Sequence, residues 1–152
     1  MKRLLLLSLM LPVLSITAYG QTCDNSLMAH VYRPERLVKV KGCVTVTGTV
    51  VGRRTQDDGD IHYQLKVDPG QGRGWMNQKN VSRQHGTLVF EPICVKRVKQ
   101  DSAQDACRNF VQDILLPKKG DRVSITGIHV VDNEGGHGWR EIHPVSQIKI
   151  IP

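Results

Sequence analysis

The sequence predicts a mainly β fold, in which five strands form a small barrel and one α-helix lies between the third and fourth strands. Three observations support this fold. Apolar and polar residues alternate in several short segments, a glycine interrupts two of those segments, and only residues 101–117 place apolar residues at helical spacing. A period of two is typical of strands, whereas a period near 3.6 is typical of helices.

The first two strands are expected at residues 40–54 and 60–68. In the first, valines and threonines alternate through "CVTVTGTV", and Gly48 interrupts the pattern. A glycine inside a strand commonly marks a bulge or a sharp bend. In the second, "IHYQLKV" alternates without a break, and Asp58-Gly59 between the two segments predicts a hairpin turn.

The third strand is expected at residues 87–95, where Pro92 indicates an edge position because proline cannot donate to a neighbouring strand. A long polar, glycine-rich connection precedes it. The helix is expected at residues 101–117, since its apolar residues form one stripe and Ser102 with Asp105 resembles a capping box.

The last two strands are expected at residues 120–132, where Gly127 again interrupts the pattern, and at residues 138–151. Five strands with a helix between the third and fourth follow the plan of the OB-fold, a small barrel whose coiled strands need glycines or bulges to close. The alternative is a small α+β sandwich with an open antiparallel sheet. We expect residues 21–152 to form a single OB-like β-barrel domain.

The first 20 residues have the layout of a secretory signal peptide. Lys2 and Arg3 precede the apolar run "LLLLSLMLPVLSI", and small residues at Ala18 and Gly20 are spaced like a cleavage site. An uncleaved membrane anchor is the alternative, but the run is short for a span. We expect a secreted or periplasmic protein with no membrane span after signal removal.

The charge of the chain favours anionic partners only weakly. The full chain has a formal net charge of +7, and removing the two basic residues of the signal leaves +5. A moderate positive charge favours contact with nucleic acid, phosphate-rich glycans or membrane surfaces. It is equally common in soluble exported proteins, and the basic residues are scattered along the chain.

The four cysteines of the chain all follow the predicted signal peptide. An even number in an exported protein favours two disulfides over free thiols. We expect Cys23–Cys43 and Cys94–Cys107, because each pair joins sequence neighbours and closes a short loop. A zinc site is the alternative, but the chain has no Cys-x-x-Cys pair.

The stretch "GGHGWREIHPV" near the end of the chain holds the main candidate site. Trp139, Glu141 and His143 alternate along one strand and therefore share a face, His137 precedes them on a loop, and His62 lies on the polar face of the second strand. We interpret these five residues as a ligand-binding or structural cluster. A metal site of His137, Glu141 and His143 is the less favoured alternative.

Three further residues are secondary binding candidates. Arg53 and Arg54, close to several aspartates in the first hairpin, resemble part of a metal-dependent nuclease site. Trp75 lies in the long polar connection among amide side chains, where it would either stack on a sugar or anchor the loop. With few aromatic residues in the chain, base stacking on a nucleic acid is a weaker prediction.

Four segments resemble a known group of proteins, namely "CVTVTGTVV", "DGDIHYQLKVDPG", "NVSRQHGTLVFEPICV" and "GDRVSITGIHVVDNEGGHGWREIHPV". They resemble small exported bacterial OB-fold-like proteins of unassigned function that end in an HGW-x-EIHPV motif. The resemblance covers residues 43–145 and implies an OB-type barrel. It also implies that His137, Trp139, Glu141, His143 and Pro144 act as a linked unit, but it implies no reaction, cofactor or partner.

These observations predict a binding or accessory protein rather than an enzyme, because neither a nucleophile elbow nor a phosphate loop is present. We expect a monomer without a cofactor, and a ligand from the envelope or the extracellular space: a glycan, a protein or an anionic polymer. A metal-dependent hydrolase and a nucleic-acid-binding OB module are the two alternatives.

Overall fold

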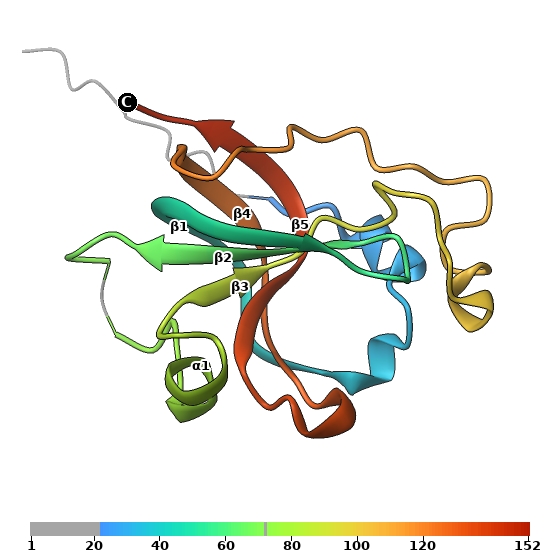
Figure 1. Ribbon diagram of the computed structural model, residues 1–152, viewed down its shortest axis with the longest axis horizontal. Helices are drawn as coiled ribbons and strands as arrows, with labels where there is room; N and C mark the ends of the chain where they lie inside the picture. Colours follow the sequence, from blue (N-terminus) through green and yellow to red (C-terminus); the bar gives the residue numbers. More distant parts are fainter. Residues whose placement is uncertain (1–21, 72) are drawn as a thin grey trace, which may run out of the picture.

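The computed structural model describes residues 22–71 and 73–152, and its centre is a five-stranded mixed sheet that closes into a ring (Figure 1). The strands are β1 (Leu37–Thr55), β2 (Ile61–Val67), β3 (Leu88–Phe90), β4 (Arg122–Asp132) and β5 (Arg140–Ile150). They pair in the order β1-β2-β3-β5-β4, and β4 pairs with β1 to close the ring. Every pairing is antiparallel except the parallel one between β3 and β5. The prediction of five strands in a mainly β fold is confirmed, whereas the predicted signal peptide at residues 1–20 lies outside the described residues.

The strand bounds differ most from the prediction at β3. This strand has three residues and lies between β2 and β5, so the predicted edge position is wrong. Pro92 lies beyond the end of β3, where its carbonyl oxygen accepts a hydrogen bond of 3.1 Å from the backbone N–H of Ile61. The proline therefore ends the strand without leaving an open sheet edge.

The α-helix lies elsewhere than predicted. Helix α1 (Gln78–Arg83) is between β2 and β3, in the connection that the sequence indicated to be a loop. Asn77 and Asn80 form a reciprocal capping box at its start. The other helical segments are the 3-10 turns η1 (Asn25–His30), η2 (Pro34–Arg36), η3 (Asp101–Ala103) and η4 (Glu134–Gly136). The predicted helix at residues 101–117 is therefore wrong, since only η3 forms within it.

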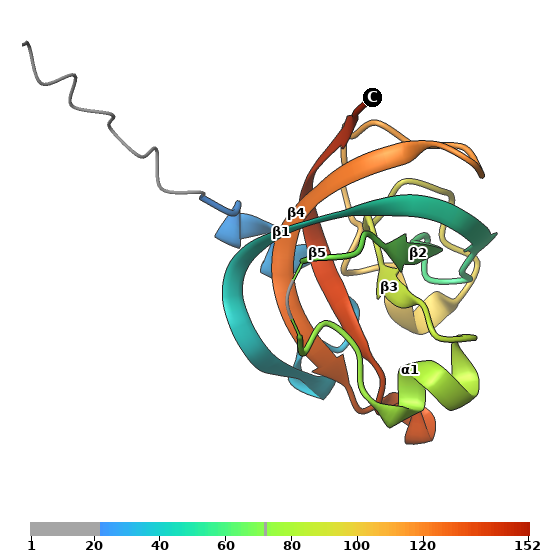
Figure 2. The same ribbon diagram turned by 90° about the vertical axis from the view of Figure 1, so that its left-hand side faces the viewer.

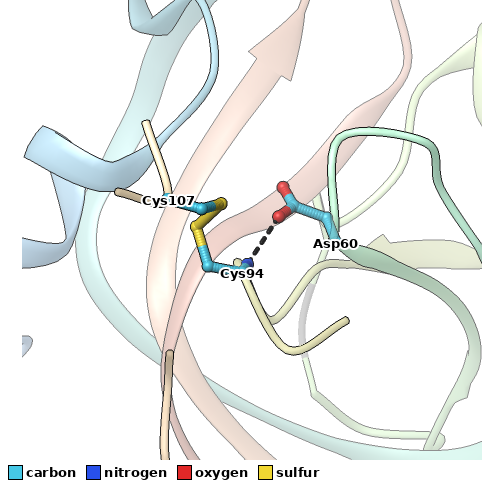
Figure 3. Close-up of side chains that lie close together, drawn as sticks. All are labelled: Asp60, Cys94 and Cys107. Atoms are coloured by element: carbon cyan, nitrogen blue, oxygen red, sulfur yellow. Dashed lines mark hydrogen bonds between the residues drawn. A yellow bond between two sulfur atoms is a disulfide. The ribbon is translucent and has the colours of Figure 1, made fainter. Parts of the chain in front are cut away.

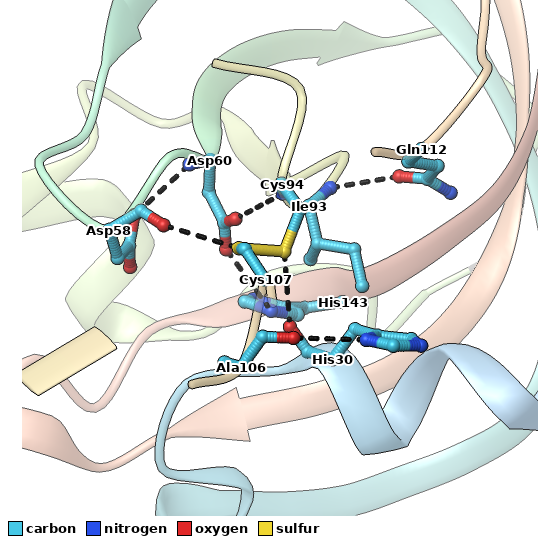
Figure 4. Close-up of a disulfide and its surroundings, with 9 residues drawn as sticks. All are labelled: His30, Asp58, Asp60, Ile93, Cys94, Ala106, Cys107, Gln112 and His143. Carbon is cyan, nitrogen blue, oxygen red and sulfur yellow. Dashed lines mark hydrogen bonds and ion pairs between the residues drawn. A yellow bond between two sulfur atoms is a disulfide. The ribbon is translucent and has the colours of Figure 1, made fainter. Parts of the chain in front are cut away.

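Long-range contacts of Ala106, Cys107 and Gln112, shown in Figure 4, hold residues 101–117 in an irregular path. The disulfide to Cys94 fixes Cys107, and the ring of Phe110 stacks on His30 with centroids 3.7 Å apart. Asn109 between them has a φ of 56°, which interrupts a right-handed helix. Beyond it, inward and outward residues alternate, so that Val111 is 75% exposed whereas Gln112 is buried. The segment is extended there, and its apolar residues do not share one helix face.

The two glycines that interrupt the predicted strand pattern, Gly48 and Gly127, allow close approach of neighbouring backbone. A Cβ at Gly48 would lie 2.4 Å from the carbonyl oxygen of Lys66, and one at Gly127 would lie 2.5 Å from that of Pro144. The β4–β5 register shifts on both sides of Gly127, as the sequence predicted for a bulge. At Gly48 the register is regular, so this glycine provides space rather than a bulge.

The interior of the ring is apolar. Its centre includes the stacked rings of Tyr63 and Phe90, whose centroids are 4.7 Å apart, and side chains from every strand surround them. A second apolar cluster, built from Leu27, Val31, Ile93 and Cys94, joins the N-terminal segment to the chain that follows β3. In both views α1 and η4 lie at the end of the ring away from the C-terminus (Figures 1 and 2).

Both predicted disulfides, Cys23–Cys43 and Cys94–Cys107, are present, and the described residues include no free cysteine. Disulfides persist in oxidising compartments, so the two bridges indicate a location outside the cytoplasm. Among the described residues, no helix has the length and apolar character needed to cross a membrane.

Candidate functional site

Three polar side chains lie in a row across neighbouring strands, on the outer face of the ring. Tyr63 pairs with Phe90, Phe90 pairs with Ile142, and all three side chains fill the interior. Because successive residues of a strand point to opposite faces, the residues next to them point outward. These outward residues are His62, Glu91 and His143, and all three are buried beneath the segments that cover this face.

Hydrogen bonds join this row into one network. The two oxygens of Glu91 lie 2.7 Å from Nδ1 of His62 and 3.1 Å from Nδ1 of His143. The Nδ1 of His143 also lies 3.0 Å from Oε1 of Glu141, and Nε2 of His62 lies 3.1 Å from Oε1 of Gln84. Since an ionised carboxylate only accepts hydrogen bonds, Nδ1 of each imidazole is the donor. Glu91 thus connects β2 to β5 through side chains.

The remaining predicted site residues surround this network. Trp139 donates from Nε1 to Oε2 of Glu141 over 3.0 Å and is buried. His137 stacks on Trp139 with ring centroids 4.0 Å apart, and its Nδ1 lies 3.1 Å from Oδ2 of Asp132. The structure therefore brings the predicted cluster together, but His137 faces Asp132 rather than sharing a metal-sized space with Glu141 and His143.

A third carboxylate approaches His143, from the β1–β2 loop. Asp60 accepts a hydrogen bond of 2.7 Å from the backbone N–H of Cys94 and lies beside the Cys94–Cys107 disulfide (Figure 3). Its other oxygen, Oδ2, lies 3.9 Å from Nε2 of His143. Both of these atoms are buried and lack a hydrogen-bond partner.

Asp60, Glu91 and His143 are the residues that could hold a metal ion. One donor atom from each lies within 4.8 Å of the other two. A metal-bound histidine usually donates its second ring N–H to a carboxylate, and Glu141 provides that partner for His143. The two cysteines near Asp60 are joined in a disulfide, so they do not offer thiolates.

Burial and pairing shift the pKa values of the network in opposite directions. Burial alone would lower the pKa of His143, but hydrogen bonds to Glu141 and Glu91, with the charges of those carboxylates, raise it to about 10. Burial also opposes ionisation of Glu91, yet the bonds from His143 and His62 bring its pKa well below the usual range.

The other two carboxyl groups favour the neutral form. Burial, followed by the charge of Glu91, raises the pKa of Glu141. Burial, followed by the charge of Asp58, raises the pKa of Asp60 well above its usual range. Among these groups, Glu91 and His143 thus form the charged centre, and Asp60 and Glu141 flank it as groups able to hold a proton.

An open cavity of about 240 Å³ lies over this network. The β1–β2 loop contributes Asp57 and Asp58 to its wall, and Asp132, Glu134, His137 and Trp139 come from the end of β4 and the β4–β5 loop. Glu91 joins the cavity to the buried network. Arg36 also lines it and pairs with Asp132 and, over 3.2 Å, with Glu134. We call this cavity the acidic pocket, because five of its lining residues carry carboxylates.

The secondary candidates lie outside the acidic pocket. Arg53 and Arg54 line a different cavity, together with His62. Trp75 is only 8% exposed and packs in the core, where its Nε1 donates to the backbone oxygen of Gln71 over 2.8 Å. Its side chain anchors the loop, and it does not offer a surface on which a sugar could stack.

Sequence reasoning missed Glu91, and it considered Asp60 only among the aspartates of the first hairpin rather than beside His143. The sequence did contain a signal for Glu91. It directly follows Phe90 in the run "TLVFE", so strand alternation places the two side chains on opposite faces. Asp60 is two residues from His62, so the same alternation placed both on one side of β2. The contact with His143 depends on the parallel pairing of β3 with β5, which no local pattern reveals.

No family model matches the chain, and a comparison with curated proteins found none with significant sequence similarity.

Proposed function

We propose that this chain is an exported binding protein, secreted or periplasmic and monomeric, with the architecture of an OB-like barrel stapled by two disulfides. The acidic pocket is its proposed ligand site. OB-folds bind their ligands over the loops that follow the first and fourth strands, and residues at the corresponding places line this pocket. We extend the same proposal to the small exported bacterial OB-fold-like proteins that end in the HGW-x-EIHPV motif, which this chain resembles.

The charge of the pocket supports a ligand that carries a cationic group. Its lining includes five carboxylate residues but only Arg36 and His137 as bases. Arg36 is already paired with Asp132 and Glu134. The carboxylate of Asp57 makes no hydrogen bond or ion pair to other described residues, and it is exposed. A ligand ammonium or guanidinium group would therefore find an uncompensated negative charge.

The buried network beneath the pocket supports a binding role over a purely structural one. Removing charged groups from water is costly, and apolar residues of similar size are often at least as stabilising. Charged groups with perturbed pKa values beside a cavity are typical of functional sites. Here Glu91 belongs to both the network and the pocket wall, so the network fixes the floor on which a ligand would rest.

Titration with spermidine, followed by two-dimensional amide NMR of the oxidised protein, tests this proposal. We expect shifts around Asp57, Glu134 and the indole N–H of Trp139. The variant Asp57→Asn should weaken binding by about fivefold, the effect of losing one exposed ion pair. Asp113→Asn removes the same charge from an exposed position outside the pocket and should leave affinity unchanged. Equal effects of both variants on affinity, or no NMR shifts with spermidine, would exclude the proposed site. Stronger binding of a neutral oligosaccharide than of spermidine would show that the ligand is not cationic.

A metal-dependent hydrolase is the second candidate, and one observation favours it. The unpartnered atoms Oδ2 of Asp60 and Nε2 of His143 face one another in a buried space. A bound divalent ion would satisfy both atoms, with Glu91 beside them. Calorimetric titration with Zn²⁺ and Mn²⁺ tests this candidate. Stoichiometric metal binding by the wild type that is lost in Asp60→Asn would support it. No metal binding by the wild type would remove it.

The remaining alternative, a nucleic-acid-binding module, is not supported at the acidic pocket. Phosphate groups would meet Asp57, Asp58 and Glu134 there, with Arg36 already paired. Single-stranded nucleic acid also needs exposed aromatic surfaces for stacking, and Trp139 is covered by His137.

A further inference from the structure

A second cavity, of about 280 Å³, lies beside the C-terminal end of α1 and the facing ends of β1 and β2. Arg54 and His62 are cross-strand partners, so both project toward the same face of the sheet. Arg83 and His85 approach from the end of α1 and the residues after it. The cavity lies on the other side of the His62–Glu91 pair from the acidic pocket, because His62 lines one and Glu91 lines the other.

The lining of this cavity is strongly basic. Its ionisable residues are Arg53, Arg54, Arg83, His62 and His85, and none of the described residues that line it is acidic. Within the described chain, the three arginines form no ion pair with a carboxylate, and each of them is exposed. Arg53 interacts with the hydroxyl of its cross-strand partner Tyr63, whereas the charges of Arg54 and Arg83 are available to a ligand.

The floor of the cavity is held in place by hydrogen bonds. Oε1 of Gln84 accepts from Nε2 of Gln64 over 3.4 Å and lies 3.1 Å from Nε2 of His62. The Nδ1 of His62 donates to Glu91. Both ring nitrogens of His62 thus face oxygen atoms, so the ring is held in place at the floor of the cavity. The exposed guanidinium groups at the rim supply the positive charge that suits an anion.

A third, smaller cavity of about 140 Å³ extends this basic surface. It shares Arg53 and Arg54 with the second cavity and adds Lys96 at its far side. The basic lining therefore extends from Arg83 in one cavity to Lys96 in the other, with two arginines common to both. No phenylalanine, tyrosine or tryptophan lines either cavity, so the site offers charge without a surface for stacking bases.

We propose that these two adjoining cavities bind the phosphate groups of a linear oligophosphate. Guanidinium groups recognise phosphate oxygens through paired hydrogen bonds. Arg54 and Arg83, which line the same cavity from β1 and α1, would contact successive groups. This site uses residues distinct from the lining of the acidic pocket, so either proposal can fail without the other.

Calorimetric titration of the oxidised protein with sodium tripolyphosphate tests this proposal. The double variant Arg54→Gln/Arg83→Gln should weaken binding by at least about tenfold, which corresponds to the loss of about 1.4 kcal/mol. Arg97→Gln is the matched control, since Arg97 is exposed and lines neither cavity. It should change the affinity by less than about twofold, because its side chain lines neither cavity and solvent ions screen its charge. The thermal midpoints of all variants should agree, because the substituted side chains are exposed.

Three results with tripolyphosphate would overturn the proposal: no heat of binding, equal weakening by Arg97→Gln and the double variant, or amide NMR shifts, in a titration with the same ligand, that map to another surface. A parallel titration uses single-stranded DNA with the same number of phosphates. Tighter binding of DNA than of tripolyphosphate would also overturn the proposal, because it would require base contacts that this site does not provide.

Discussion

Glu91 is the residue that connects the two halves of the buried network. Its two oxygens accept from His62 on β2 and from His143 on β5, and it is only 4% exposed. Two imidazoles that share one buried carboxylate depend on it for both hydrogen bonding and charge. A buried group that loses its partner retains the cost of desolvation without the compensating bond.

Replacing Glu91 by glutamine should therefore destabilise the fold strongly. We expect Glu91→Gln to lower the free energy of unfolding by about 3 kcal/mol, the effect of breaking a buried ion pair by neutralising one partner. Urea denaturation of the oxidised protein measures the change. Glu35→Gln makes the same substitution at an exposed residue and should stay within about 0.5 kcal/mol of wild type. Equal stability of the two variants would show that the network contributes nothing.

The shifted pKa of His143 predicts a loss of stability at alkaline pH. Its pKa rises from 6.5 to about 10 in the folded protein, so its contribution is complete below pH 6.5 and declines as the pH approaches 10. One such proton changes the free energy of unfolding by at most about 1.4 kcal/mol per pH unit. The urea concentration at the midpoint of unfolding should therefore decrease as the pH is raised from 6.5 to 9. Imidazole NMR gives the direct measurement, in which His143 should remain protonated at about pH 8; titration near its ordinary pKa would contradict the prediction.

At the scale of elements, Gly127 determines how closely β4 and β5 approach. A Cβ there would lie 2.5 Å from both the carbonyl oxygen of Pro144 and Cγ2 of Ile142. The backbone of β5 cannot move away easily, because the next residue pairs are part of the closed ring. The bulge and the close contact thus both require a residue without a side chain.

We expect Gly127→Ala to lower the free energy of unfolding by about 3 kcal/mol, at the upper end of the range for overpacking a buried position. Gly42→Ala is the matched control, because Gly42 lies in β1 with nothing within 4 Å of an added Cβ. Thermal unfolding of both variants measures the difference. If the two alanine variants unfold at the same temperature, β5 adapts and the close contact does not constrain the fold.

The sequence predicted the strands well because their pattern is local. β2 alternates inward and outward residues over its whole length, so its period of two is readable without knowing the partners. The helical spacing of residues 101–117 was misleading, since the Cys94–Cys107 bridge and the stacking of Phe110 on His30 outweigh helix propensity. α1 was missed because it is short and has no apolar stripe, although Asn77 and Asn80 carried a capping signal.

The candidate site was predictable only in part, for the same reason. Glu141 and His143 are two residues apart, so their proximity followed from strand geometry alone. His62 is close to them because Glu91 lies between β2 and β5, and this arrangement depends on the order of strands in the ring. Long-range pairing of this kind leaves no periodic signal in the sequence.

At the scale of the whole molecule, the disulfides hold segments that lie outside the ring. Cys23–Cys43 joins the N-terminal segment to β1, and Cys94–Cys107 closes the irregular chain that follows β3. The second bridge also lies beside Asp60, whose Oδ1 accepts from the backbone N–H of Cys94 (Figure 4). Loss of this bridge would therefore loosen one side of the buried network. It would also release the loop between Cys94 and Cys107 in the unfolded chain.

Replacing both cysteines of this bridge should show that double effect. We expect Cys94→Ala/Cys107→Ala to lower the free energy of unfolding by about 3 kcal/mol, as is typical for a loop of this length. Cys23→Ala/Cys43→Ala should give a similar loss, since its loop of 20 residues compares with 13 for the other. Hydrogen exchange separates the two variants: only the first should accelerate exchange of the Cys94 position and of the β1–β2 loop around Asp60. Equal exchange in both variants would show that the bridge acts on the unfolded chain alone and does not support the site.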